Sequence, residues 1–218
     1  RDLRIDKTLL SETVSYGAIT ALQQACQPIG KAVIQSVINA QGVSVMAAFN
    51  AVSRIDDFAC IPEQSISSGI MTCIAQNRGA GKEERVRASF RGSLLLMLAM
   101  GLAMSLIMYV SASASVGFML GTRSGAAFEN ARDYLKLVAL FYTLCFKGNT
   151  FAGYFNGIGK VSVPFLGATS HIALRVVLSW LLVGRMGLPA VALATGLGWA
   201  MVNTMWAVVK HVTERKER

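Results

Sequence analysis

The sequence carries little charge. Only 15% of its 218 residues are Asp, Glu, Lys or Arg, against about 25% in an average soluble domain. Hydrophobic residues make up 53% of the chain, and its mean hydropathy is +0.48. A disordered chain needs the opposite balance, and a water-soluble domain needs more charge on its surface. The composition therefore predicts a polytopic membrane protein.

Histidine and cysteine are also scarce. The chain has 2 histidines and 4 cysteines, and no CxxC pair occurs among Cys26, Cys60, Cys73 and Cys145. We interpret the four as thiols buried in the membrane and expect no metal ligands. The motifs HExxH and GxSxG are absent, which predicts no catalytic residues and no enzyme. We expect no bound cofactor.

What the sequence does contain is long apolar runs. Each is long enough to cross a hydrocarbon layer of about 30 Å as a helix, in which all backbone polar groups are satisfied. These runs predict an all-α membrane protein with six transmembrane helices. The expected spans are 15–40, 44–76, 93–116, 134–156, 161–183 and 188–209.

The basic residues support this count of spans. If successive connections alternate between the two faces of the membrane, 13 Lys and Arg lie on one face and 4 on the other. The first group is Arg1, Arg4, Lys7, Arg78, Lys82, Arg85, Arg87, Arg91, Lys160, Lys210, Arg215, Lys216 and Arg218, and the second is Arg123, Arg132, Lys136 and Arg185. Positive residues favour the cytoplasmic side. We therefore expect a multi-pass protein of the plasma membrane, in a bacterium the inner membrane, with both termini cytoplasmic.

The net charge of +9 also raises the question of nucleic-acid or nucleotide binding. The segment from Gly79 to Lys82 resembles half of a phosphate-binding loop, but a P-loop needs glycine where Gln76 stands and Ser or Thr where Glu83 stands. We interpret the basic segment 78–91 as a loop that fixes topology, with contact to anionic lipids as the alternative. No nucleic-acid partner is expected.

Seven ionisable residues fall inside the predicted spans. They are Lys31, Arg54, Asp56, Asp57, Glu63, Lys147 and Arg175. Facing lipid, they would together cost on the order of 20 kcal/mol, so we expect most of them to face protein or water. Arg54 and Asp57, three residues apart, form the expected local ion pair.

Several of these charges fall into patterns with other polar residues. In the first span Gln24, Gln27, Lys31 and Gln35 recur at helical spacing and form one polar stripe. In the second span Asp56 and Glu63 share a face, and Pro62 between them is expected to bend the helix. The fourth span adds Lys147 and Asn149.

These residues are our candidates for a substrate or ion pathway. Intramembrane carboxylates can couple transport to an ion, because H⁺ or Na⁺ neutralises them and changes which conformation is favoured. Asp57, Asp56 and Glu63 are the coupling candidates, and Arg54 joins them in the pathway. The alternative is a set of fixed ion pairs and hydrogen bonds between helices.

Two stretches of the sequence resemble the multidrug and toxic compound extrusion (MATE) transporters. The first runs from Ala47 to Ile55, continues at Pro62, and ends in Gln76-Asn77-Arg78-Gly79-Ala80-Gly81-Lys82. The second contains Asn156-Gly157-Ile158-Gly159-Lys160, Pro164, Arg175 and Gly187-Leu188-Pro189. The resemblance covers nearly the whole chain.

The resemblance implies twelve helices in two six-helix lobes, of which this chain is the C-terminal lobe, with the N-terminal lobe as its partner. It also implies export of small organic, often cationic, compounds in exchange for H⁺ or Na⁺, by alternating access. One departure is Lys147, with Cys145 and Asn149 nearby, where some branches of the family have an acidic residue. A flippase for lipid-linked precursors, for which Lys31, Arg54, Lys147 and Arg175 would suit phosphate, and a non-transporting assembly subunit are the alternatives.

Overall fold

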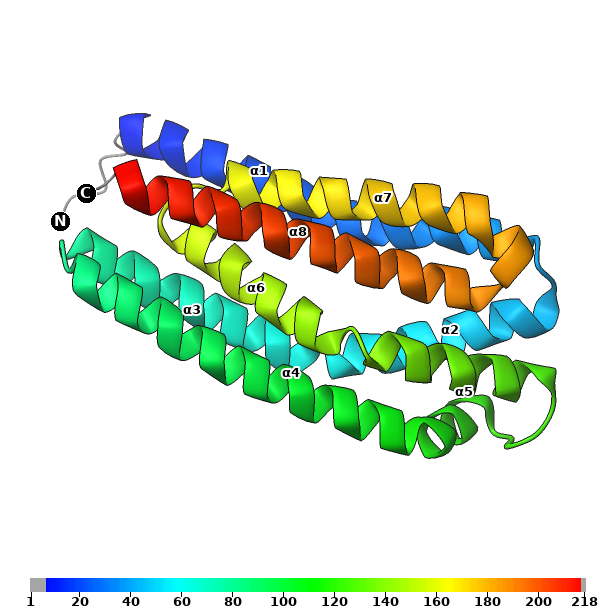
Figure 1. The fold of residues 1–218 in the computed structure, drawn as a ribbon. Helices are drawn as coiled ribbons and strands as arrows, with labels where there is room; N and C mark the ends of the chain where they lie inside the picture. Colours follow the sequence, from blue (N-terminus) through cyan, green and yellow to red (C-terminus); the bar gives the residue numbers. More distant parts are fainter. Residues whose placement is uncertain (1–6, 217–218) are drawn as a thin grey trace, which may run out of the picture.

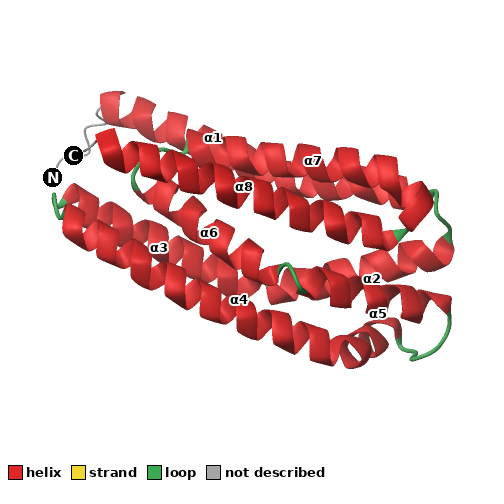
Figure 2. Ribbon diagram, viewed as in Figure 1, coloured by secondary structure: helices red, strands yellow, loops and turns green. Residues whose placement is uncertain are grey.

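The computed structural model describes residues 7–216, and every element in that range is a helix (Figure 2). The helices lie along one another in an elongated bundle, and α1 begins at the same end at which α8 finishes (Figure 1). In chain order they are α1 (Lys7–Asn39), α2 (Val43–Ala59), α3 (Ile61–Gly79), α4 (Glu83–Leu120), α5 (Ala126–Ala139), α6 (Tyr142–Gly157), α7 (Ser162–Met186) and α8 (Leu188–Lys216). The predicted all-α fold is confirmed.

The predicted runs correspond to these helices with two divisions. Four of the runs are each a single helix, namely α1, α4, α7 and α8, whereas 44–76 is divided into α2 and α3 and 134–156 into α5 and α6. By length and hydropathy, Glu83–Leu120, Ser162–Met186 and Leu188–Thr213 qualify individually as membrane spans. The other described helices do not qualify individually, because those of the divided segments are shorter and α1 carries the polar stripe.

Proline causes the first division. Cys60 separates α2 from α3, and Pro62 is the second residue of α3. Proline has no backbone N–H, and its ring clashes with the carbonyl group four residues earlier, so a straight helix cannot continue through it. Near Pro62, where the sequence predicts a bend, the helix is interrupted at the single residue Cys60, which divides the predicted run into α2 and α3.

The second division has no proline, and the sequence predicted an unbroken helix here. The Phe141 N–H donates to the Val138 carbonyl oxygen at 2.9 Å, three residues back instead of four. This tighter turn ends α5, and α6 begins at Tyr142. Because local sequence gives no reason for it, we attribute the break to the packing of α5 against α2 and of α6 against α3.

Glycines bring α3 and α6 close together. A Cβ atom added at Gly153 would lie 2.8 Å from the Ser67 carbonyl oxygen, and one at Gly157 would lie 2.8 Å from the Met71 carbonyl oxygen. The Ser67 hydroxyl also donates to the Asn149 carbonyl oxygen at 2.9 Å. The close approach agrees with the small-xxx-small pattern of packed membrane helices.

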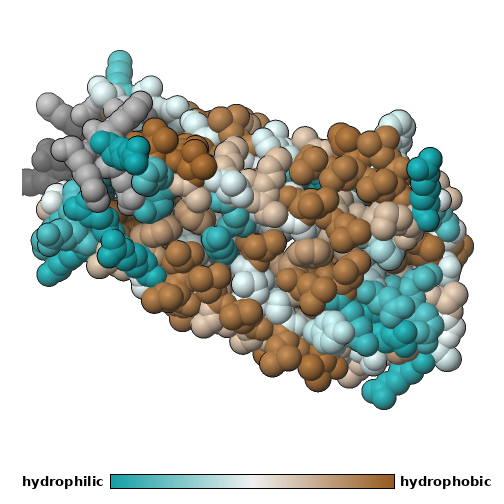
Figure 3. Space-filling view, in the orientation of Figure 1, coloured by the Kyte–Doolittle hydropathy of each residue, from teal (hydrophilic) through white to brown (hydrophobic). Residues whose placement is uncertain are grey.

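The outer surface suits a bilayer. Large apolar side chains of α4, among them Leu95, Leu102, Val110 and Phe118, are exposed. Hydrophobic residues cover most of the middle of the face in Figure 3, and hydrophilic residues gather toward the two ends. An apolar belt of this kind between polar ends is expected of helices embedded in lipid.

Candidate functional site

A polar cavity of about 520 Å³ lies within the bundle, beside both helix breaks. Five parts of the chain supply its polar and aromatic walls: α1, the α2–α3 segment, the α5–α6 segment, α7 and α8. Its polar and aromatic lining includes Gln24, Gln27, Lys31, Asp56, Asp57, Cys60, Glu63, Tyr142, Cys145, Asn149, His171, Arg175 and Trp199. The cavity contains three carboxylates and two basic side chains.

The structure gathers most of the predicted pathway residues around this cavity. Gln24, Gln27, Lys31, Asp56, Asp57, Glu63 and Asn149 all line it. The other three candidates lie outside its walls. Arg54 is exposed on α2, Lys147 is half-buried on α6, and Gln35 donates to the Asn39 side-chain oxygen at 2.7 Å on α1.

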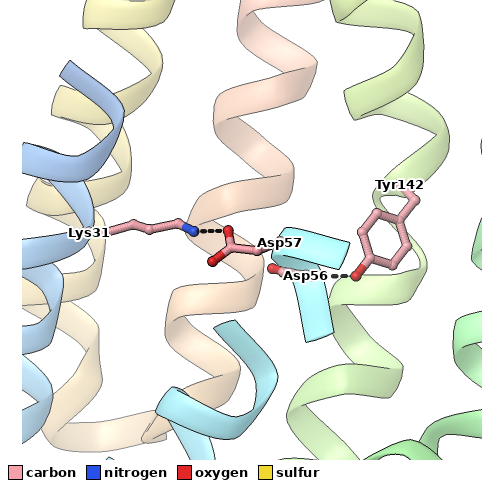
Figure 4. A network of polar contacts seen from close by, with 4 residues as sticks. All are labelled: Lys31, Asp56, Asp57 and Tyr142. Atoms are coloured by element: carbon pink, nitrogen blue, oxygen red, sulfur yellow. Dashed lines mark hydrogen bonds and ion pairs between the residues drawn. The ribbon is translucent and has the colours of Figure 1, made fainter. Parts of the chain in front are cut away.

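Asp57 forms an ion pair with Lys31, which brings α2 into contact with the polar stripe of α1 (Figure 4). The predicted local pair of Asp57 with Arg54 is therefore wrong. Among the described residues Arg54 forms no ion pair, because its side chain is exposed on α2 while Asp57 is directed toward α1. The Asp57 side chain is 67% exposed, so this pair lies at the open side of the cavity.

Asp56 faces the opposite way. The Tyr142 hydroxyl donates a hydrogen bond to the Asp56 carboxylate (Figure 4). Tyr142 is the first residue of α6, so this bond joins α2 to the second helix break. Arg175 of α7 lines the same cavity. The Tyr142 hydroxyl and the nearby Arg175 guanidinium offset part of the cost of removing this half-buried carboxylate from water.

Glu63 lies deeper and has a different partner. It is only 3% exposed, and the Cys145 thiol donates to its Oε2 atom at 3.2 Å. Within the described residues, no basic nitrogen lies within 4.0 Å of the Glu63 carboxylate. A buried carboxylate without a basic partner carries a desolvation cost that a bound cation would offset.

An aromatic pair completes the wall on α7 and α8. The rings of His171 and Trp199 lie with their centroids 4.6 Å apart and tilted by 38°. Both residues line the cavity, and His171 is buried. Ring faces that line a cavity can contact the apolar body of an organic molecule and attract a cation.

Sequence reasoning missed several of these wall residues. Tyr142, His171 and Trp199 have no pattern in the sequence that separates them from core aromatics, and Cys60 and Cys145 carry no metal-ligand spacing. Arg175 was recognisable as an intramembrane charge but was not assigned to the pathway. The other wall residues can be recognised only once helices that are distant in the sequence pack around the cavity.

Long apolar helices around a charged cavity that is open on one side define one lobe of a membrane transporter. The family model of MatE matches residues 20–181, and the chain belongs to this family. A relative from Bacillus subtilis (strain 168), the probable multidrug resistance protein YpnP, is 26% identical over 93% of this chain and 47% of its own length. The FAD transporter of Shewanella oneidensis is 33% identical over 41% of this chain and 19% of its own length.

Solved structures show the same fold. An outward-facing MATE multidrug resistance transporter superposes with a TM-score of 0.86 at 18% identity, covering 93% of this chain and 45% of that one. A MATE protein in complex with MaL6 gives a TM-score of 0.88 at 17% identity, covering 98% and 49%. The chain thus spans about half the length of these transporters and of the Bacillus relative, as one lobe does.

Proposed function

We propose that this chain is the C-terminal lobe of an exporter that carries small organic, often cationic, compounds out of the cell in exchange for H⁺ or Na⁺. The N-terminal lobe of the same transporter is its partner, and the membrane is a bacterial inner membrane. The observation that carries the proposal is the cavity, in which three carboxylates and five aromatic side chains surround a space large enough for an organic molecule. The printed name of the Bacillus relative supports a multidrug substrate range.

The charge balance of the cavity favours organic cations. Asp56, Asp57 and Glu63 outnumber Lys31 and Arg175, and Lys31 is already paired with Asp57. A flippase for phosphate-bearing precursors would need unpaired basic side chains. That alternative is not favoured, because Lys31 is paired with Asp57, because Arg54 and Lys147 lie outside the cavity walls, and because the chain belongs to MatE.

The ion pair between Lys31 and Asp57 is the proposed coupling element. An H⁺ or Na⁺ that binds Asp57 competes with Lys31 for the carboxylate and weakens the contact between α1 and α2. A ligand changes a conformational equilibrium only through a difference in affinity between two states. The open position of Asp57 at the cavity mouth lets the ion reach it.

We test this with the complete transporter that contains this lobe, expressed in cells without their own efflux pumps. The parent is expected to lower accumulation of a cationic dye in a pH- or Na⁺-dependent way. Asp57→Asn is expected to reduce the ion-dependent efflux rate by about tenfold, which corresponds to about 1.4 kcal/mol. Residues 1–218 expressed alone serve as the background.

The matched control is Asp133→Asn, which removes an exposed carboxylate on α5 outside the cavity. It should export as the parent does. If the parent exports none of several dyes, the exporter proposal is wrong. If Asp57→Asn and the parent export equally, the exporter stands and the coupling assignment falls.

A further inference from the structure

We propose that Cys60, Glu63 and Cys145 form a binding site for a thiophilic divalent metal ion, of the class of Zn²⁺ or Cd²⁺. The site is independent of the exporter proposal, because binding is measured without transport. It differs from the sequence prediction, which assigned no metal ligands. The reason is that 82 residues separate Glu63 from Cys145, so no local motif exists.

The geometry is that of a partly assembled metal site. The ligand atoms of the three residues all lie within 4.8 Å of one another, and Cys145 Sγ is 3.2 Å from Glu63 Oε2. Ligand atoms bound at about 2.3 Å to one tetrahedral ion lie about 3.8 Å apart. Small side-chain movements therefore suffice to close the site.

The donor set selects the class of ion. Two sulfurs and one carboxylate oxygen suit zinc and softer metals, whereas Mg²⁺ and Ca²⁺ require oxygen ligands. Three protein ligands leave the fourth tetrahedral position open, as in catalytic and exchangeable zinc sites. Because all three residues line the cavity, water or a small ligand can occupy that position.

The electrostatics favour an ion at this place. Glu63 is 3% exposed and has no basic partner within 4.0 Å in the described part of the chain. When a divalent ion binds and both thiols release a proton, the net charge of the three residues and the ion stays at −1. The ion therefore brings a direct partner to the carboxylate without adding net charge to the bundle.

Asn149 lies beside Cys145, and the three proposed ligands lie close to the two helix breaks. The Asn149 amide donates to the Cys145 carbonyl oxygen at 3.2 Å and lies 3.8 Å from its sulfur, as groups behind metal ligands do. Cys60 lies at the first helix break, and Cys145 lies one turn after the second. A bound ion would join α3 to α6 at the two breaks.

The test is titration of the purified complete transporter with Cd²⁺ in detergent, with a phosphine reductant that keeps the thiols reduced. Cadmium bound to thiolate gives an ultraviolet charge-transfer band, and a pH indicator reports the protons released. The parent should show both signals. Cys60→Ser and Cys145→Ser should each abolish binding of the one Cd²⁺ at this site, with its ultraviolet band and its proton release. Glu63→Gln should weaken Cd²⁺ binding by at least about tenfold.

Cys26→Ser and Cys73→Ser are the matched controls. Cys26 contacts the Thr169 hydroxyl, and Cys73 contacts the Ser89 hydroxyl and the Asn77 amide, so neither thiol belongs to the Cys60–Glu63–Cys145 cluster. Both variants should keep the full signal. Zn²⁺ should displace Cd²⁺ from the parent. A parent without the band overturns the proposal, as does a band that survives in both Cys60→Ser and Cys145→Ser.

Two further measurements keep the result decisive if a serine variant does not fold. Cd²⁺ should raise the unfolding temperature of the parent and should raise that of Glu63→Gln much less, because ligand binding stabilises the folded state by mass action. An equal rise in both would contradict the site. A parent that exports dye in a chelator but binds no Cd²⁺ would overturn the metal site and leave the exporter intact.

Discussion

Asp56 and Asp57 are neighbours in sequence but bind to opposite sides of the cavity. Successive residues of an α-helix point about 100° apart, so Asp57 reaches Lys31 on α1 while Asp56 reaches Tyr142 on α6. One turn of α2 thus connects the first helix of the bundle to the second helix break. A change in the charge of either aspartate acts on contacts between helices.

Tyr142→Phe tests the Asp56 contact. The change removes only the hydroxyl that donates to the half-buried Asp56 carboxylate, and a lost hydrogen bond to a charged group costs about 1.5 to 3 kcal/mol. The measurement is the unfolding temperature of the purified protein. Tyr109→Phe is the control, since Tyr109 is exposed. Equal unfolding temperatures for the two variants would show that the Asp56 bond contributes nothing.

The two broken helices are the distinctive elements of this bundle. The breaks at Cys60 and at Leu140–Phe141 lie beside the cavity, so side chains at helix ends, such as Cys60 and Tyr142, face it. Transporter sites are commonly built where membrane helices are discontinuous, because irregular backbone is tolerated only where it lines a cavity. After the two breaks, α3 and α6 pack against each other and hold the α2–α3 and α5–α6 segments together.

Gly153→Ala tests that contact. The new methyl group would lie 2.8 Å from the Ser67 carbonyl oxygen, so the helices must separate, and overpacking of this kind costs about 1 to 3 kcal/mol. We expect a lower unfolding temperature. Gly69→Ala, on α3 where no atom lies within 4 Å of an added Cβ, is expected to be neutral or slightly stabilising. A Gly153→Ala protein as stable as Gly69→Ala would refute the close approach.

At the scale of the whole molecule, the face of the bundle seen in Figure 3 is apolar along its middle and more hydrophilic toward both ends. The α3–α4 turn lies at the end where α1 begins and α8 finishes, and the loop between α4 and α5 lies at the other (Figure 1). The basic segment 78–91 is at the first of these ends. The positive-inside rule therefore predicts that this end faces the cytoplasm.

Labelling of introduced cysteines tests the orientation. Glu84→Cys and Ser124→Cys place one exposed thiol at each end of the bundle, in a background without the native cysteines. A membrane-impermeant maleimide should label Ser124→Cys in intact cells and Glu84→Cys only after lysis. The reverse pattern would show that the termini lie outside the cytoplasm.

The sequence by itself determined the class of the protein, its apolar runs and the distortion of the helix next to Pro62. These follow from composition and from local chemistry, since hydrophobicity and a missing N–H are properties of the chain at each position. The tertiary structure decided the rest. It replaced Arg54 by Lys31 as the partner of Asp57, broke the helix at Leu140 without a proline, and placed Cys145 against Glu63. Such contacts depend on which helix faces meet, and no local pattern encodes them.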